Sequence, residues 1–452
     1  MSNLTLTQLL EKYDVPVPRY TSYPAVPNWG ETPQREVWFD ALNRALSNDA
    51  ASLAVYVHLP FCETLCTFCG CNTVITRNHE RSAPYVATVL AELDLYLRQV
   101  AALPVRPISQ IHLGGGTPTF MPPDVLATLL QGIAARLPLR DPGYEGSVEV
   151  DPRVTTRAHL EAMRAHRISR ISLGVQDIDT EVLRLVNRPQ PLATTAALCG
   201  IARDCGYDSI NFDLIYGLPG QSAASMERLA DAVIDLRPDR LAVYSFARVP
   251  WIKPAQRKFT DEQVPSGAAK RELYEVLREA LIGAGYIELG LDHFALPHDA
   301  LAKSASAGSL HRNFMGYTDR RTTSLLGLGV SAISETPSCY HQNEKVITVY
   351  ERRLGEAEIP THRGHLLSDD DRRRAGLIRS LMTAGRAPLT DDDRDEARRE
   401  LASLVADGIV EIDHRELRIT PSGKPFIRNA AAFFDTYLRN SAREGPVYSK
   451  AI

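Results

Sequence analysis

The chain of 452 residues is predicted to form an α/β fold with a parallel sheet, followed by a smaller, mostly helical C-terminal region. Between residues 53 and 246, six short apolar runs rich in β-branched residues alternate with six segments of helical period. Beyond about residue 365 this alternation ends. Strands joined through helices lie parallel, so six such units form either an open doubly wound sheet or an incomplete barrel.

Each element follows from its own pattern of apolar residues. The strands are expected at 53–59, 108–113, 147–151, 169–175, 210–216 and 241–246. The helices between them are expected at 82–101, 123–137, 156–166, 179–187, 192–205 and 223–236. In the last ninety residues we expect helices at 370–383 and 391–407, a hairpin from 408–412 and 416–420, and a helix through Phe433 to Leu438.

The first fifty residues do not show this alternation of strand and helix patterns. The stretch PRYTSYP at 18–24 is too rich in proline and tyrosine for a helix, and it predicts an extended segment. Such a segment is either an arm that folds over a site or a surface lead-in. We therefore divide the chain into an N-terminal arm over the active site (1–50), a barrel with its extension (51–365) and a C-terminal lid domain (366–452).

Composition excludes several classes of protein. The net charge of −4 gives no reason to expect a nucleic-acid partner, which normally requires a basic surface. No apolar run approaches the roughly 20 residues needed to span a bilayer. The first residues lack the basic and apolar regions of a signal peptide. We expect a cytoplasmic protein with reduced cysteines and no membrane contact.

Four of the seven cysteines fall within the ten residues CETLCTFCGC at 62–71, directly after the first predicted strand. The spacing C-x3-C-x2-C indicates a soft metal or an iron–sulfur cluster. Three thiolates would leave one iron of a four-iron cluster open for a substrate or cofactor. A disulfide is the first alternative and a zinc site is the second, but Cys199, Cys205 and Cys339 supply no second zinc-binding arm.

Polar or glycine-rich residues follow the other predicted strands as well. Gly114, Gly115 and Gly116 come after the second strand, Glu149 ends the third, and Asp213 lies within the fifth. Because the carboxyl ends of parallel strands carry the active site, we expect a single site here. Purely structural alternatives remain open: a tight turn at the glycines, and a salt bridge between Glu149 and Arg153. Asp213 would be costly to bury without a partner.

The motifs together resemble those of a known family. CETLCTFC after YVHLPF, with GGGTP one unit later, is similar to the radical S-adenosylmethionine (SAM) enzymes. The closer resemblance is to oxygen-independent coproporphyrinogen III dehydrogenases (oxidases), and it extends from about Arg19 to Leu438. The motifs that carry it are RYTSYP, CGCN, EVDPR, SLGVQD, VNR, NFDLIYGLP, LHRNFMGYT, GLGVSAIS and FFDTYL.

The resemblance implies a partial (β/α)6 TIM-type barrel, a [4Fe–4S] cluster and two SAM molecules. Cys62, Cys66 and Cys69 match the cluster ligands, and Tyr56, His58 and Cys71 match positions with catalytic roles. Matches to the SAM bound at the open iron are Tyr56, Gly115, Glu149 and Ile333. Matches to the second SAM are Phe68, Gly116, Thr117, Gln176, Arg188, Asp213 and Ala247. A buried position in the core is an equally good interpretation of His58.

The implied reaction is anaerobic haem biosynthesis: a radical derived from SAM starts the oxidative decarboxylation of two propionates of coproporphyrinogen III, giving protoporphyrinogen IX. The implied partners are this substrate and a one-electron donor such as flavodoxin or ferredoxin, with the enzyme a monomer. The substrate has four carboxylates, so basic residues are expected to hold it. The candidates are Arg19, His58, Arg248, Lys253 and Arg312.

Two other functions remain open from the sequence. The same scaffold suits a haem-binding or haem-delivery protein, or a radical SAM enzyme acting on another tetrapyrrole. The helices and hairpin of the C-terminal region also have a winged-helix outline, which would suggest DNA binding. That region holds equal numbers of basic and acidic residues, so we expect a lid on the barrel mouth instead.

Overall fold

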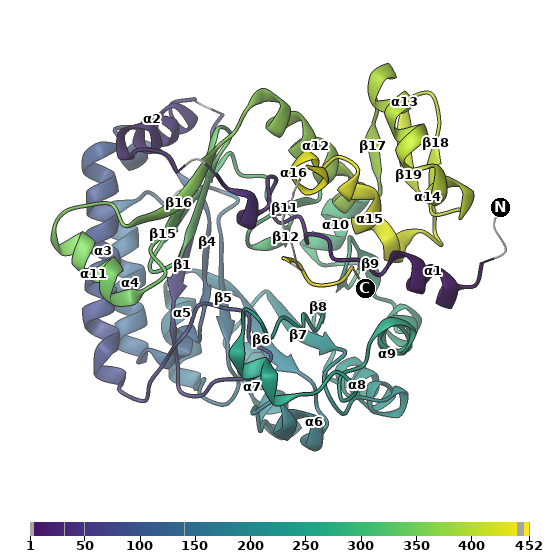
Figure 1. The fold of residues 1–452 in the computed structure, drawn as a ribbon. Helices are drawn as coiled ribbons and strands as arrows, with labels where there is room; N and C mark the ends of the chain where they lie inside the picture. Colours follow the sequence, from purple (N-terminus) through teal and green to yellow (C-terminus); the bar gives the residue numbers. More distant parts are fainter. Residues whose placement is uncertain (1–3, 31, 49, 140, 441–446, 452) are drawn as a thin grey trace.

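The computed structural model describes residues 4–30, 32–48, 50–139, 141–440 and 447–451. Its centre is a twelve-stranded sheet in the order β16-β15-β14-β13-β1-β4-β5-β6-β7-β8-β10-β9. Strands β1 to β8 of this sheet are parallel, and they wrap into the incomplete barrel visible in Figure 1. The barrel stays open because β8 pairs with antiparallel β10 rather than with a strand of the opposite edge.

All six predicted strands of the barrel are confirmed. They are β1 (Leu53–Leu59), β4 (Ile108–Gly115), β5 (Glu145–Val150), β6 (Ile168–Gln176), β7 (Ser209–Tyr216) and β8 (Arg240–Ser245). The helices that connect them are α3 (Ser82–Gln99), α4 (Pro123–Arg136), α5 (Arg157–Ala165), α6 (Thr180–Leu185), α7 (Leu192–Asp204) and α8 (Ala223–Leu236). The apolar faces of the helices and the outer face of the sheet bury one continuous core, because parallel strands are covered by their crossover helices.

The extension of the sheet at both edges was not predicted. Beside β1 lie β13 (Ser324–Leu328), β14 (Ile333–Thr336), β15 (Cys339–Asn343) and β16 (Thr361–Leu366), and beside β8 lie β10 (His293–Ala295) and β9 (Ile287–Leu289). Strand β13 pairs parallel with β1, so it acts as a seventh parallel strand. Between these strands run α9 (Gly267–Gly283), α10 (Ala300–Ser306), α11 (Ile347–Gly355) and the hairpin of β11 (His311–Asn313) with β12 (Gly316–Thr318).

The first fifty residues contain two helices that were not predicted, α1 (Leu6–Tyr13) and α2 (Arg35–Leu46). Residues 18–24 form no helix, as expected. Val17, Tyr20 and Tyr23 are buried together with residues of the C-terminal region, so this segment is not a surface lead-in. Figure 1 shows α1 beside the C-terminal elements. The placement of the arm over the active site stays a prediction.

The C-terminal region forms its own apolar core with the arm. It contains α12 (Asp369–Ala384), β17 (Arg386–Pro388), α13 (Asp391–Glu400), α14 (Ala402–Ala406), the hairpin β18 (Val410–Ile412) and β19 (Glu416–Ile419), α15 (Ile427–Ala432) and α16 (Thr436–Arg439). The helix predicted at 391–407 is interrupted at Leu401, whose backbone is not helical. The last predicted helix is split because Asp435 caps α16 from an extended conformation. None of the described helices is long and apolar enough to cross a membrane.

Candidate active site

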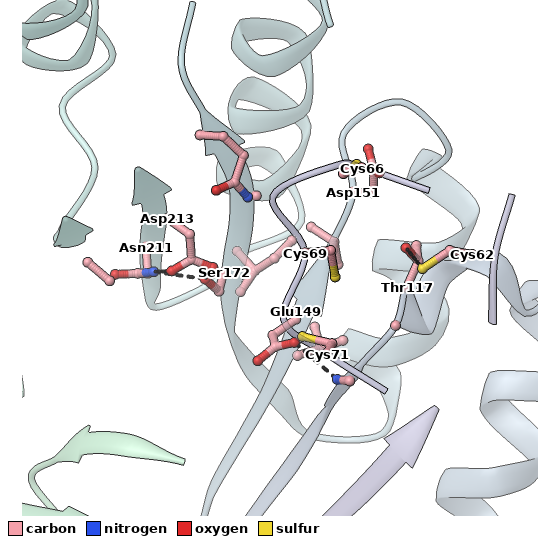
Figure 2. Close-up of a pocket in the computed structure, with 18 of the residues that line it drawn as sticks. Cys62, Cys66, Cys69, Cys71, Thr117, Glu149, Asp151, Ser172, Asn211 and Asp213 are labelled. Carbon is pink, nitrogen blue, oxygen red and sulfur yellow. Dashed lines mark hydrogen bonds between the residues drawn. The ribbon is translucent and has the colours of Figure 1, made fainter. Parts of the chain in front are cut away.

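A cavity of about 540 Å³ opens at the carboxyl ends of the barrel strands. The predicted site residues that line it are Cys62, Cys66, Phe68, Cys69, Cys71, Gly115, Gly116, Thr117, Glu149, Gln176, Arg188 and Asp213. Four predicted residues do not line the cavity: Tyr56, His58, Ala247 and Ile333. Of these, Tyr56 and His58 lie on β1, and the His58 ring packs against the lining residue Gly115. Figure 2 shows the cysteines, Thr117, Glu149 and Asp213 around this one space. The structure thus brings most of the predicted residues to one place.

The cysteine loop is held at both of its ends. Strands β2 (Phe61–Cys62) and β3 (Val74–Ile75) pair with each other and close the loop. Within it, the Cys69 amide donates to the Cys66 carbonyl oxygen at 3.1 Å, and the Thr67 amide donates to the Val186 carbonyl oxygen at 3.0 Å. The loop is therefore fixed against the segment that carries Arg188.

The cysteines lie in different electrostatic environments. Burial raises the pKa of Cys62 to about 11 and outweighs its hydrogen bond with Thr117, whose hydroxyl oxygen lies 3.3 Å from the sulfur. A hydrogen bond from the Cys71 thiol lowers the pKa of Cys69 to about 6, and the same bond raises the pKa of Cys71. Cys69 is thus favoured as a thiolate, and Cys71 stays a neutral thiol beside it.

Cys66 is surrounded by two arginines and an aspartate. Its sulfur lies 3.5 Å from Nη1 of Arg188 and 3.9 Å from Nη2 of Arg153. Both guanidinium groups also bind Oδ2 of Asp151, at 3.1 and 2.6 Å. The suggested salt bridge between Glu149 and Arg153 is therefore wrong, because Arg153 pairs with Asp151 on its own strand-end turn. The Cys66 sulfur therefore lies against two guanidinium groups that share one carboxylate.

These thiols fit an iron–sulfur cluster. Three sulfur donors from one loop face a common cavity, and no second cysteine arm of the kind a zinc site needs approaches them in the described residues. No set of three acidic, histidine or cysteine side chains among those residues converges on one point as for a single ion. A cubane does not require this, because each thiolate binds a different iron. No disulfide joins any of the seven cysteines.

Glu149 forms the wall of the cavity next to the glycine turn. Its Oε2 accepts the Gly115 amide at 3.1 Å, and Oε1 lies 3.3 Å from Nε2 of His112. Burial works to raise the pKa of Glu149, but His112 and the Gly115 amide more than offset this, so the pKa is lowered. Glu149 therefore remains a carboxylate that still has free acceptor positions toward the cavity.

Gly115 could not be any other residue without a rearrangement. Its φ of +108° disfavours side chains, and a Cβ would lie 2.5 Å from the His58 ring. A Cβ on Gly116 would lie 2.6 Å from the backbone of Pro60. The two glycines therefore pack closely against His58 and Pro60, and they line the cavity without side chains.

Asp213 is part of a polar network, as its position in an apolar strand predicted. It accepts hydrogen bonds from the Ser172 hydroxyl at 2.8 Å and the Asn211 amide at 2.9 Å (Figure 2). Burial, reinforced by the charge of Glu149, raises its pKa to about 6. Asp213 is thus mostly ionised at neutral pH, and a mildly acidic pH protonates it.

Tyr56 and His58 form a chain of hydrogen bonds behind the glycine turn. The Tyr56 hydroxyl lies 3.0 Å from Nδ1 of His58, and Nε2 of His58 lies 2.8 Å from the Asn72 carbonyl oxygen. His58 is only 6% exposed, and burial lowers its pKa. Its ring therefore connects the end of the cysteine loop to β1 as a neutral imidazole.

None of the basic residues proposed to hold the substrate lines the cavity. Arg19 forms an ion pair with Asp292, and Arg248 forms one with Asp261. Arg312 donates to the Tyr20 carbonyl oxygen at 2.9 Å, and Lys253 donates to the Cys71 carbonyl oxygen at 3.0 Å.

Two other arginines, which were not predicted from the sequence, line the cavity instead. Arg170 on β6 pairs with Glu145 at 3.0 Å, and Arg240 on β8 pairs with Asp299 at 2.6 Å. Both lie near the first residue of their strands rather than at the strand ends. The period of two along the inward face of each strand would have been the signal for them.

Comparison with known proteins agrees with this geometry. The model of the radical SAM superfamily matches residues 56–233. Oxygen-independent coproporphyrinogen III oxidases from Pseudomonas aeruginosa and Escherichia coli are 38% and 39% identical to the chain, over 96% of it and 96% of their own length. A solved structure of coproporphyrinogen III oxidase from E. coli, described as a radical SAM enzyme, superposes with a TM-score of 0.87. It is 38% identical and covers 93% of this chain and 97% of its own.

Proposed function

The chain belongs to the oxygen-independent coproporphyrinogen III oxidases of the radical SAM superfamily, and from this membership we propose a role for each part of its cavity. It is a radical SAM oxidoreductase of haem biosynthesis, and coproporphyrinogen III is its substrate. The superfamily implies a [4Fe–4S] cluster and SAM. The observation that carries the proposal is the convergence of the cysteine loop, the glycine turn and two carboxylates on one cavity.

Cys62, Cys66 and Cys69 would hold the cluster. When bound, the cluster and SAM supply a one-electron reduction that yields a 5′-deoxyadenosyl radical for hydrogen abstraction from a propionate side chain. Cys71 would act beside them as a protonated thiol, since its thiol donates to Cys69 and its pKa is raised. Its position supports a role as a proton donor or hydrogen-bonding group rather than as a fourth ligand.

Two SAM molecules are assigned to two sets of residues. The first set consists of Tyr56, Gly115, Glu149 and Ile333, and the second consists of Phe68, Gly116, Thr117, Gln176, Arg188, Asp213 and Ala247. Glu149 and Asp213 support this assignment because each is a carboxylate suited to accept hydrogen bonds from ribose hydroxyls or an ammonium group. The bare backbone at Gly115 and Gly116 lets such a ligand approach closely.

The substrate would occupy the part of the cavity below these groups. Arg170 and Arg240 lie there, so we assign them, in place of the five candidates from the sequence, to the substrate carboxylates. The arm and the C-terminal region would cover the mouth and exclude water from the radical chemistry. The proposal includes a monomeric cytoplasmic enzyme that receives electrons from a small carrier protein.

An anaerobic assay tests the function directly. The reconstituted protein is given reductant, SAM and coproporphyrinogen III, and 5′-deoxyadenosine, CO2 and the porphyrin product are measured together. We expect CO2 and protoporphyrinogen IX to form in step with SAM cleavage. SAM cleavage without CO2 would mean another substrate, and haem binding without SAM cleavage would mean a carrier. Cys71→Ser should still assemble the cluster but lose decarboxylation, and a fully active variant would remove Cys71 from the mechanism.

A further inference from the structure

The surface beside the cysteine loop carries exposed apolar and basic residues that, apart from Leu65, do not line the cavity. We propose that it is the docking site of an acidic one-electron carrier protein. We call this surface the loop patch, and it consists of Leu65, Trp251, Ile252, Lys253, Arg257 and Lys258. The inference rests on the proposed function, which requires an external electron for every SAM cleaved. One electron would pass from the carrier to the cluster, and no bond would form or break.

Three hydrogen bonds place the loop patch against the cysteine loop. Lys253 donates from Nζ to the Cys71 carbonyl oxygen at 3.0 Å. Lys258 donates to the Leu185 carbonyl oxygen at 2.9 Å, and Asn187 donates from its side-chain amide to the Leu65 carbonyl oxygen at 2.7 Å. The segment at 250–258, the end of α6 and the cysteine loop are therefore one continuous surface. A protein bound there would lie against the outer side of the loop that holds the predicted cluster.

The loop patch exposes apolar side chains that the fold does not need to expose. Trp251 is 47% exposed and Ile252 is 56% exposed, and they are joined by Leu65 at 41%. The other two tryptophans of the chain, Trp29 and Trp38, are buried. An exposed apolar patch with polar residues around it is typical of a protein interaction site.

The cations of the loop patch are not neutralised. Lys253, Arg257 and Lys258 each bind a backbone carbonyl oxygen, and none of them has an ion pair with a described residue. Of the acids near these cations in the chain, Asp261 pairs with Arg248, Glu63 lies 3.3 Å from His79 and Glu262 has a hydrogen bond with Thr260, so none of the three pairs with the loop patch. A positive patch on a protein with net charge −4 attracts a negative partner and sets the rate of encounter.

The test compares two reductants on the protein with its reconstituted cluster. The variant Arg257→Glu/Lys258→Glu reverses the charge of the loop patch without touching Lys253, which contacts the cysteine loop. The matched control, Arg398→Glu/Arg399→Glu, reverses the same charge on the exposed surface of α13. Cluster reduction is followed by electron paramagnetic resonance with reduced flavodoxin, an acidic flavoprotein, and in parallel with dithionite.

We expect reduction by flavodoxin to slow at least tenfold in the loop-patch variant, to fall steeply with salt in the unmodified protein, and to be unchanged in the control. Trp251→Ala should also slow it. Reduction by dithionite should not change in any variant. Equal flavodoxin rates in the loop-patch variant and the unmodified protein would overturn the proposal, and so would an equal loss with both reductants. A cluster that assembles and is reduced while no CO2 is released would contradict the proposed function and leave this inference standing.

Discussion

At the scale of single residues, the glycine turn and Glu149 are mutually dependent. The Gly115 amide donates to Glu149, and Gly115 itself has a positive φ that favours glycine. A Cβ on Gly114 would also lie 3.0 Å from the Glu149 carboxyl carbon. Gly114 therefore leaves room for the carboxylate.

Asp213 gives a prediction about pH. Because its pKa is raised to about 6, Asp213 is ionised at pH 8 and mostly protonated at pH 5. The neutral carboxyl accepts weaker hydrogen bonds, so we expect the affinity for the second equivalent of SAM to fall about tenfold as the pH falls through 6. Equilibrium dialysis of the reconstituted protein at pH 5 and pH 8 measures this.

Asp213→Asn is the control for this measurement. It should bind the second equivalent weakly at both pH values, because its side chain does not titrate. Two equivalents bound with equal affinity at pH 5 and pH 8 by the unmodified protein would show that Asp213 does not hold SAM.

Which site residues could be predicted depends on what each residue type reveals in a sequence. The four clustered cysteines follow a strand, Glu149 ends one and Asp213 interrupts an apolar one, and the structure places all of them at the cavity. Arg240 begins its strand and Arg170 is the third residue of its own, so both read as ordinary flanking charges. The period of two places them on the inward face of each strand, but only the closure of the strands into a barrel shows that this face lines a cavity.

At the scale of elements, the same contrast separates the barrel from its extension. The barrel strands present regularly spaced apolar residues to the core that their helices cover, so the pattern predicts them. Strand β15 instead buries His341, Gln342 and Asn343, with Asn343 fully buried. In a sequence, buried polar side chains look like those of a loop, because their hydrogen-bond partners lie far away along the chain.

One such partner is Glu92 on α3, which is fully buried. Its carboxylate accepts the Gly329 amide at 2.8 Å, the Asn343 side-chain amide at 2.6 Å and the Tyr350 hydroxyl at 2.6 Å. Burial raises its pKa to about 7. Glu92 thereby ties α3 to the turn after β13, to β15 and to α11.

We predict that Glu92→Ala lowers the free energy of unfolding by about 3–5 kcal/mol, because it leaves three buried donors without an acceptor. Tyr350→Phe removes one hydrogen bond and should cost only about 1 kcal/mol. Urea unfolding of the two variants beside the unmodified protein measures the difference. Equal losses in both variants would mean that Glu92 does not organise the three elements.

At the scale of the whole molecule, the two end segments of the described chain lie together. Pro16 and Lys450 form a β-bridge, and the Ala451 amide donates to the Val15 carbonyl oxygen at 2.9 Å. Arg428, 3% exposed, donates to backbone carbonyl oxygens of both segments, including those of Pro18 and Ala451. Burial lowers its pKa to about 9. A single side chain thus joins the arm, the tail and α15.

We predict that Arg428→Met releases both segments, because four carbonyl oxygens lose their shared donor. Hydrogen exchange of the Val17 and Ala451 amides should become at least tenfold faster, while amides of the barrel strands keep their protection. Arg439→Met, which removes an exposed pair with Glu396, is the matched control and should change neither amide. Unchanged exchange in the Arg428 variant would show that the β-bridge holds the segments without it.

The β-bridge between Pro16 and Lys450 also has a consequence for synthesis on the ribosome. The arm emerges among the first residues, but residues 449–451, which pair with it, are translated more than four hundred residues later. Until then Val17, Tyr20 and Tyr23 lack the apolar partners that bury them. The barrel strands can pair during translation, whereas the arm has to wait for residues 449–451. The barrel and its cysteine loop can therefore form well before the arm is fixed in place.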